Sequence, residues 1–287
     1  MIQRKFIIGS EWIYLKIYTG ERTADRMIST TIAQLVDTIF EKSLSDKWFY
    51  IRYKDEGGFH LRLRFHLNII DNIGQIIQII YQILSPFIEN GAVHSINFDT
   101  YVREIERYGA DSYCIAEDLF YYNSIDCLKY ISVCDPFQEQ SFNRIRFTLQ
   151  GIEQILNALS YDNKRKRDFC LTCRDRYRQE FKIFSTASKK AHNDLYRKYK
   201  KFVEESFLGP KNHLLTSEFI QKLEIEKLSD QLASENIQWD DFWVAIIHMM
   251  INRLFVSYNR KYEMIIYDFA FKYFDSIENQ KNCCNNK

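Results

Sequence analysis

Four short runs of alternating apolar and polar residues constrain the fold of this chain more than any other feature. They cover residues 11–18, 47–54, 59–66 and 93–101. Such period-two alternation is typical of β-strands that bury one face. Helical periodicity separates the first run from the second over residues 25–44. It also separates the third from the fourth over residues 70–89, where we expect a break near Pro86. The predicted order is therefore β-α-β-β-α-β.

This order is that of a ferredoxin-like α+β fold, in which two helices cover one face of a four-stranded antiparallel sheet. Residues 55–58 are expected to form the hairpin turn between the two middle strands. The later sequence is mostly helical, with periodic stretches at 112–134, 138–160, 164–206, 215–235 and 240–275. We predict a single domain over 1–287, with a sheet portion at 1–105, a helical portion at 106–275 and a polar tail at 276–287.

The sheet face opposite the helices is expected to be open, basic and aromatic. If Leu61, Leu63 and Phe65 face the helices, the alternate residues of that strand share the other face: His60, Arg62, Arg64 and His66. The neighbouring strands are expected to add Trp48, Tyr50, Arg52, Lys54, Trp12, Tyr14, Lys16 and Tyr18. Two parallel arginines cannot neutralise each other, so a carboxylate or a phosphate is their natural ligand. A solvated strand face whose arginines meet surface acids is the alternative.

Two further segments carry polar groups in unusual places. Residues 101–109 (YVREIERYG) follow the last strand and place Arg103 and Arg107 one helical turn apart, although both could simply pair with nearby glutamates. In the apolar helix over 243–255, His248 and Asn252 share one face, and Arg253 follows them. A histidine there can act as a base near neutral pH, or it can be a core residue bonded to a backbone carbonyl.

Composition excludes several classes of protein. The 39 Lys and Arg residues nearly balance 38 Asp and Glu residues, so the net charge of +1 argues against attraction of nucleic acid to the whole surface. The basic run at 164–167 is more typical of a solvated helix face. Neither GxGxxG nor GxxxxGK[ST] occurs, which disfavours nucleotide-cofactor enzymes. Seven cysteines, no signal peptide and no apolar stretch of membrane-spanning length favour the cytoplasm.

Four segments in chain order resemble the C-terminal glutamate-elimination domain of class I lanthipeptide dehydratases, which also occurs as a stand-alone thiopeptide-type bacteriocin biosynthesis protein. They are W-x-Y-x-K-x-Y at 12–18, a W-F-[FY]-I-R-Y hairpin that ends in H-L-R-L-R-F at 48–65, Y-x-R-E-x-E-R-Y-G at 101–109, and H-M-x-x-N-R-L at 248–254. The resemblance covers almost the whole chain. It implies a lyase that removes glutamate from glutamylated Ser or Thr of a ribosomal precursor peptide, leaving dehydroalanine or dehydrobutyrine.

The same resemblance implies roles for individual residues. His248 matches the family's histidine implicated in removing the α-proton, and Arg62, Arg64 and Arg107 match its arginines around the glutamyl group. The candidate substrate-binding residues are Arg52, Tyr50, His60, Arg103, Asn252 and Arg253. No metal or organic cofactor is implied. The expected partners are a precursor peptide, with its leader and core, and a separate tRNA-dependent glutamylating protein, so neither direct nucleic-acid contact nor a membrane span is expected.

Three alternatives remain open. The thiopeptide pyridine synthases share this fold and join two dehydroalanines by a [4+2] cycloaddition with release of the leader. The paired arginines favour elimination, because a cycloaddition has no glutamate to hold. An open aromatic sheet could bind RNA as RRM domains do, but the RNP1 pattern is absent. A catalytically silent scaffold for the precursor peptide would keep its function after the change His248→Ala.

Overall fold

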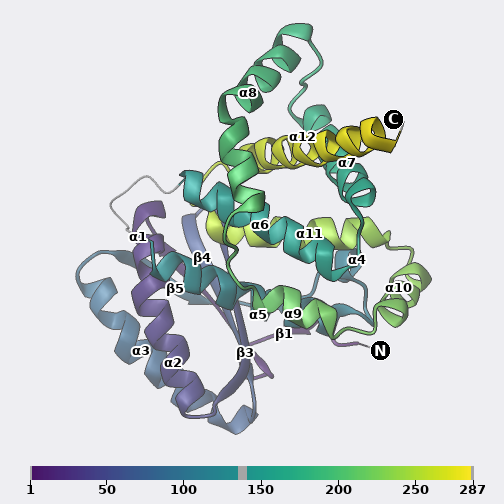
Figure 1. The fold of residues 1–287 in the computed structure, drawn as a ribbon. Helices are drawn as coiled ribbons and strands as arrows, with labels where there is room; N and C mark the ends of the chain where they lie inside the picture. The colour runs from purple at the N-terminus through teal and green to yellow at the C-terminus, as the bar shows by residue number, and fades with distance from the viewer. Residues whose placement is uncertain (1, 135–140, 286–287) are drawn as a thin grey trace. The chain divides into compact units, whose positions relative to one another are not determined.

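The computed structural model describes residues 2–134 and 141–285, with side chains described as far as Gln280. The chain forms two compact units (Figure 1). Unit 1 comprises Met1–Glu139 and Glu224–Ser257, and unit 2 comprises Gln140–Leu223 and Tyr258–Lys287. Unit 1 therefore contains the predicted sheet together with a later helical segment of the chain, and unit 2 is built from helices.

The sheet of unit 1 confirms the ferredoxin-like fold class. Its strands are β2 (Trp12–Thr19), β3 (Ser45–Asp55), β4 (Gly58–Leu67) and β5 (Val93–Phe98). They lie in the order β3-β4-β2-β5, and each neighbouring pair is antiparallel. Two short strands, β1 (Lys5–Phe6) and β6 (Tyr101–Val102), form a separate antiparallel pair.

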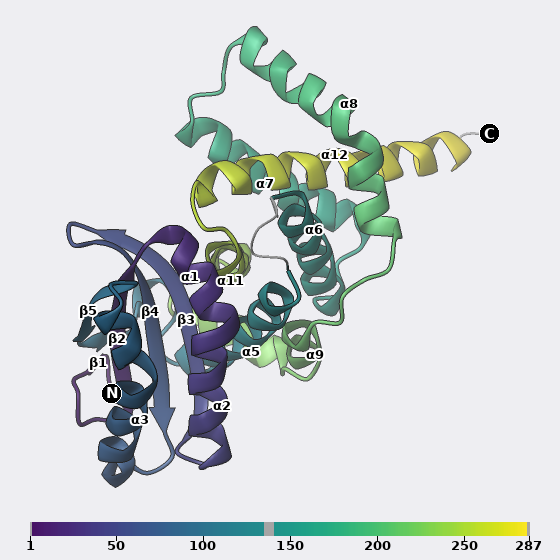
Figure 2. The same cartoon turned by 90° about the vertical axis from the view of Figure 1, so that its left-hand side faces the viewer.

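The helices between the strands lie together on one face of the sheet (Figure 2). The first crossover is one continuous helical segment made of α1 (Glu21–Met27), the π-helical turn η1 (Ile28–Ile32) and α2 (Ala33–Glu41). The second is the 3₁₀ turn η2 (Ile70–Asn72) followed by α3 (Ile73–Glu89). The expected break near Pro86 is wrong, because α3 continues to Glu89 and a proline in the last turn removes only one backbone hydrogen bond.

The apolar side of the sheet forms the core of unit 1. Ile13, Leu15 and Ile17 of β2 are completely buried, and so are Leu63 and Phe65 of β4. Leu35, Ile39, Ile76 and Leu84 are the completely buried residues of α2 and α3. Period-two and helical patterns thus meet in one apolar layer, as the sequence predicts.

The remaining helices divide between the two units. Unit 1 contains α4 (Ile105–Tyr108), α5 (Tyr113–Ser132), α10 (Ile225–Ser234) and α11 (Trp239–Leu254), and both α5 and α11 pack against β3. Unit 2 contains α6 (Ser141–Ala158), α7 (Asn163–Glu180), α8 (Thr186–Leu208), α9 (Leu215–Gln221) and α12 (Asn259–Asn285), and α12 packs along α7. No helix in the described ranges is long and apolar enough to cross a membrane.

Three of the predicted helices are each two helices. The stretch 164–206 divides into α7 and α8, 215–235 into α9 and α10, and 240–275 into α11 and α12. Lys182 and Tyr258 adopt left-handed backbone conformations, with φ of 54° and 56°, which end the right-handed path between two of these pairs. Ser185 then caps α8, because its Oγ accepts the backbone N–H of Ser188. Apolar periodicity does not report such single-residue breaks.

Candidate functional site

The register of the β3–β4 hairpin decides which side chains lie beside the paired arginines. Asp55 pairs with Gly58 across the turn, so Phe49, Ile51 and Tyr53 stand opposite Arg64, Arg62 and His60. Directly paired residues of antiparallel strands project from the same face. The expected position of Trp48, Tyr50, Arg52 and Lys54 on the arginine face is therefore wrong, and they lie on the face that carries Leu61 and Leu63.

Arg62 and Arg64 of β4 are both stacked on aromatic rings. The Arg62 guanidinium lies 3.4 Å from the centre of the Tyr53 ring, and its Nε donates to Nε2 of His60 at 3.2 Å. The Arg64 guanidinium lies 4.3 Å from the Tyr14 ring and 4.9 Å from the Tyr101 ring. These cation–π contacts hold the two planar groups in fixed orientations.

Neither Arg62 nor Arg64 forms an ion pair with a carboxylate of the described chain. Arg64 is only 7% exposed, and its buried Nε has no hydrogen-bond partner in the same part of the structure. The third cation of this face, Lys16, differs because it pairs with Asp99 at 2.6 Å, which raises the pKa of the lysine and lowers that of the aspartate. Two adjacent guanidiniums without acids can bind a dianion such as a dicarboxylate.

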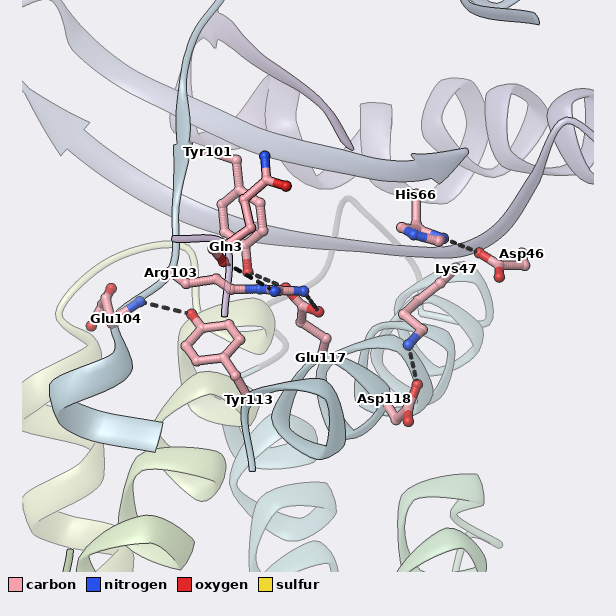
Figure 3. Close-up of polar contacts among 10 residues, drawn as sticks. All are labelled: Gln3, Asp46, Lys47, His66, Tyr101, Arg103, Glu104, Tyr113, Glu117 and Asp118. Carbon is pink, nitrogen blue, oxygen red and sulfur yellow. Dashed lines mark hydrogen bonds and ion pairs between the residues drawn. The ribbon is translucent and has the colours of Figure 1, made fainter. Parts of the chain in front are cut away.

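The arginine face is covered over much of its area, so the expectation of an open face is wrong. Trp12, Tyr14, Tyr18 and Phe49 are all nearly buried. The Tyr101 ring lies against the rings of Trp12 and Phe49, and Phe120 of α5 also contacts Phe49. His66, at one end of the face, pairs with Asp46 (Figure 3). The aromatic residues therefore form a packed layer around the two arginines.

His60 links the hairpin turn to Arg62. Its Nδ1 lies 3.2 Å from the carbonyl oxygen of Gly58, and its Nε2 accepts from Arg62, which is the hydrogen-bonding pattern of a neutral imidazole. Burial lowers the pKa of His60, and this effect outweighs the opposing influences of the Gly58 carbonyl and Asp55. His60 is therefore neutral at pH 7 and positions the Arg62 guanidinium.

Four of the candidate substrate-binding residues form a second cluster, where α11 meets the edge of β3. The side-chain amide of Asn252 bonds both backbone groups of Arg52, each at 2.9 Å. The backbone oxygen of Arg253 accepts from Arg52 Nε at 2.8 Å and from the Tyr50 hydroxyl at 3.3 Å. Arg52 also pairs with Asp25 of α1. These contacts fasten α11 to the edge strand.

Arg253 itself is completely buried inside unit 1. Its guanidinium donates to Asn123 Oδ1 at 2.9 Å and to Ser124 Oγ at 3.0 Å, and it forms no ion pair with a described carboxylate. Burial lowers the pKa of Arg253 to about 10, so the group is still charged at pH 7. Neutral oxygens of α5 thus solvate this cation in place of water.

Arg103 takes part in a buried ion pair (Figure 3). Its Nε and Nη2 donate to the two carboxylate oxygens of Glu117 at 2.8 and 2.6 Å. The Tyr101 hydroxyl donates to the same carboxylate at 2.8 Å, and the Tyr113 hydroxyl accepts the backbone N–H of Glu104 at 2.9 Å. This bidentate pair joins the segment after β6 to α5.

Arg107 lies apart from that network, beside an open pocket of about 480 Å³. The pocket is lined by Glu104, Glu106, Arg107, Asn236, Ile237, Gln238 and Asp241. Arg107 is half-exposed and lies 3.4 Å from Glu104. The lining contains three carboxylates and one guanidinium, so it is acidic overall.

The turn after Arg107 requires a glycine. Gly109 has a φ of +80°, and a Cβ at this position would lie 2.3 Å from Ser112 Oγ. The Glu235 carboxylate accepts the backbone N–H groups of Ala110 at 2.5 Å and Asp111 at 3.0 Å. The motif at 101–109 thus continues into a turn whose backbone N–H groups bind the carboxylate of Glu235. No sequence pattern predicts this contact.

His248 lies on α11, one turn before Asn252 and on the same side of the helix. Its side chain is partly exposed, unlike those of its neighbours Ile247 and Met250. Among the predicted site residues, the structure thus brings Arg62, Arg64 and His60 together on one face, and Tyr50, Arg52, Asn252 and Arg253 together at the β3 edge. Arg103 and Arg107 have their own acidic partners.

The comparisons with known proteins agree with this architecture. The sequence profile of the lantibiotic biosynthesis dehydratase C-terminal family matches residues 12–274. The chain belongs to this family. No curated protein matches the chain. The match includes both arginines of β4 and the whole of α11, so every predicted site residue lies inside the family's domain.

Three solved structures show the fold of this dehydratase C-terminal family member. The tRNA-dependent lantibiotic dehydratase MibB from Microbispora sp. 107891 matches 95% of the chain with a TM-score of 0.64 and 17% identity, but the chain spans only 29% of MibB. TsrL matches 93% with a TM-score of 0.60 and 15% identity, and 95% of TsrL is covered. The pyridine synthase TbtD, from thiomuracin biosynthesis, matches 93% with a TM-score of 0.66 and 10% identity, and 99% of TbtD is covered. The chain thus shares the fold of these three proteins and belongs to the lantibiotic biosynthesis dehydratase C-terminal family.

Proposed function

We propose that the protein is a lyase that eliminates glutamate from glutamylated Ser or Thr residues of a ribosomal precursor peptide, leaving dehydroalanine or dehydrobutyrine. The substrate comes from a separate tRNA-dependent glutamylating protein. MibB, of which the chain spans 29%, is a tRNA-dependent lantibiotic dehydratase, and this likeness supports a tRNA-dependent partner. Aminoacyl-tRNA is made in the cytoplasm, and we place the reaction there.

The observation that carries this proposal is the pair of guanidiniums on β4. Arg62 and Arg64 are held by aromatic rings, have no carboxylate partner among the described residues, and include a buried Nε without a hydrogen bond. The leaving glutamate has one free carboxylate in the substrate and two in the product. Fixed guanidiniums therefore bind the product side of the reaction more strongly than the substrate and stabilise the charge that develops.

His248 is the proposed base. Removal of the α-proton forms an enolate on the substrate carbonyl, and expulsion of the glutamate carboxylate then breaks the Cβ–O bond. The proton moves to His248, and the electron pair of the Cβ–O bond leaves with glutamate. A histidine suits this step because its ordinary pKa is close to neutral. The family resemblance of the segment at 248–254, together with the partly exposed position of His248, supports this role.

A pyridine synthase is the second candidate, because TbtD has the same fold and nearly the same length. In that reaction two dehydroalanines of one peptide would combine in a [4+2] cycloaddition, with release of the leader. No dicarboxylate is formed in such a reaction. Arg62 and Arg64, which form no ion pair with a described carboxylate, would then have no ligand that requires both of them, and this difference favours elimination.

Mass spectrometry of two peptides distinguishes the candidates. One aliquot of protein receives a glutamylated precursor peptide, and another receives the fully dehydrated peptide. Loss of glutamate from the first, with a dehydro residue left behind, supports elimination. An unchanged first peptide with cyclisation and leader release from the second would make the protein a pyridine synthase. If neither peptide changes while His248→Ala still supports the pathway, the protein is a catalytically silent scaffold, and a His248→Ala variant with full elimination activity would show that His248 is not the base.

A further inference from the structure

The two units of the chain carry opposite net charges. Unit 2 contains 23 Lys and Arg residues against 13 Asp and Glu residues, a net charge of +10. Unit 1 contains 16 Lys and Arg residues against 25 Asp and Glu residues, a net charge of −9. The net charge of +1, on which the expectation of no nucleic-acid contact partly rests, is therefore the sum of two large opposite charges. The net charge of +10 therefore produces a positive electrostatic potential at unit 2 that the net charge of the whole chain does not reveal.

The first two thirds of α8 concentrate the positive charge of unit 2. Over Thr186–Lys201 this helix has six basic residues and a single acid, Asp194. The basic residues are Lys189, Lys190, Arg197, Lys198, Lys200 and Lys201, and all six are exposed. The buried residues of α8 are Val203, Ser206 and Phe207, which all lie in its last turns. The basic segment therefore presents its charge to solvent.

Several of these cations have no acid to neutralise them. Lys189, Lys190 and Lys198 form no ion pair within the described ranges, and neither does Lys182 in the preceding loop. The other three cations of the patch have acidic neighbours on α8 itself, in the pairs Arg197–Asp194, Lys200–Glu204 and Lys201–Glu205. The basic residues of α7 differ from them. Arg174 pairs with Asp175, and Arg178 pairs with Asp268 of α12, so carboxylates of unit 2 itself neutralise those charges. The α8 surface is thus a cationic patch, whereas much of the basic sequence of α7 is structural.

Two exposed aromatic rings lie near this patch, one next to it along the chain and one in contact with a ring of α8. Phe184, between α7 and α8, is 60% exposed, and Phe142 of α6 is 43% exposed and lies 5.1 Å from the Tyr199 ring. Lys198 also contacts the Tyr199 ring. Cations that follow a backbone, together with exposed rings that stack on bases, are the usual elements of a surface for single-stranded nucleic acid. An acidic peptide would need the cations but not the rings.

We propose that the basic face of α8, with Lys182 and Phe184 of the adjoining loop, binds RNA through its phosphate backbone. The basic side chains form three adjacent pairs, at 189–190, 197–198 and 200–201. Together they span roughly 18 Å of the helix axis, which is long enough to contact several successive phosphates of one strand. Such contacts are independent of base sequence. The residues of this surface belong to unit 2 and those of the arginine face to unit 1, so the proposal does not depend on the reaction that the protein catalyses.

Fluorescence anisotropy with labelled bacterial tRNA tests this proposal, using the full chain at several salt concentrations. We expect binding that weakens steeply as salt rises. A variant with Lys189→Gln, Lys190→Gln and Lys198→Gln should bind at least about tenfold more weakly, and the slope of log Kd against log salt should fall by about 3. The matched control changes the exposed Lys42, Lys129 and Lys227 of unit 1 to Gln and should leave tRNA binding unchanged.

Three results would overturn the proposal. One is no binding of tRNA at low salt. A second is an equal loss of affinity in both triple variants, which would indicate attraction to net charge alone. The third is competition by poly-glutamate as effective as that of unlabelled RNA at the same charge concentration, which would make an acidic peptide the ligand. Circular dichroism of both variants establishes that they are folded.

Discussion

The side chain of Asn252 occupies the position that a further strand would take beside Arg52. Its amide donates to the Arg52 carbonyl and accepts the Arg52 backbone N–H, both at 2.9 Å. An exposed strand edge can form backbone hydrogen bonds with another chain, and a helix that covers the edge prevents such pairing. The contact also fixes α11, and with it His248, against the sheet. A motif residue that the sequence assigns to substrate binding thus has a structural contact in the folded chain.

Replacement of this asparagine should therefore reduce stability. In Asn252→Ala, the backbone N–H and carbonyl of Arg52 both lose their partner in a partly buried setting, and we expect the free energy of unfolding to fall by about 2 kcal/mol. Urea unfolding measures the change. The control is Asn193→Ala, at an exposed position of α8. An Asn252→Ala protein as stable as the wild type would show that α11 does not depend on this contact.

Arg103 should likewise matter for folding more than for catalysis. Its ion pair with Glu117 is buried, with the two side chains 8% and 2% exposed. Arg103→Ala leaves the Glu117 charge without its main partner and should cost about 3–5 kcal/mol of stability. The double change Arg103→Met, Glu117→Leu should recover much of this loss, because it removes both charges. Thermal or urea unfolding of the wild type and the two variants measures these changes, and an Arg103→Ala protein of wild-type stability would contradict the prediction.

The neutral state of His60 predicts a pH dependence of stability. Burial lowers the pKa of His60 in the folded protein below its unfolded value, so the unfolded chain binds this proton first as the pH falls. The contribution of His60 is fully present above the unfolded pKa, about 6.5, and is lost as the pH falls through the folded pKa.

Urea unfolding at pH 7.5 and 5.5 measures this effect. His60→Gln removes the titrating group and keeps an acceptor for Arg62, so its stability should change less between the two pH values than that of the wild type. His213→Gln, at an exposed position, is the control and should retain the wild-type change. If His60→Gln and the wild type lose equal stability, His60 does not titrate in this range.

The sequence predicts the sheet well because its signals are local and repetitive. Period-two alternation and the Asp55–Gly58 turn place all four main strands, and the order β-α-β-β-α-β is enough for the topology. The pairing across this turn also determines the register of β3, and with it the sheet face on which each β3 side chain lies. With Asp55 opposite Gly58, each even-numbered residue of one strand faces an odd-numbered residue of the other. Phe49 and Tyr53 could therefore have been placed beside the arginines from the loop length alone.

The partners of the polar residues could not be predicted in this way. Arg103 and Glu117 are fourteen residues apart, and Arg52 and Asn252 are two hundred apart. Whether an arginine meets a carboxylate, a backbone oxygen or an aromatic ring depends on packing between distant elements, and periodicity carries no information about it. The breaks after α7 and α11 depend on single left-handed residues, Lys182 and Tyr258, and are equally invisible.

The most direct test of the central claim measures glutamate released from a glutamylated precursor peptide by wild-type protein, Arg64→Gln and the control Arg22→Gln. Arg22 is an exposed arginine of α1. We expect the wild type and the control to release glutamate and leave a dehydro residue. Arg64→Gln should be slower by about 10²–10³-fold while remaining folded, because one fixed donor to the leaving carboxylate is lost. No release by the wild type, or equal release by Arg64→Gln, would contradict the account.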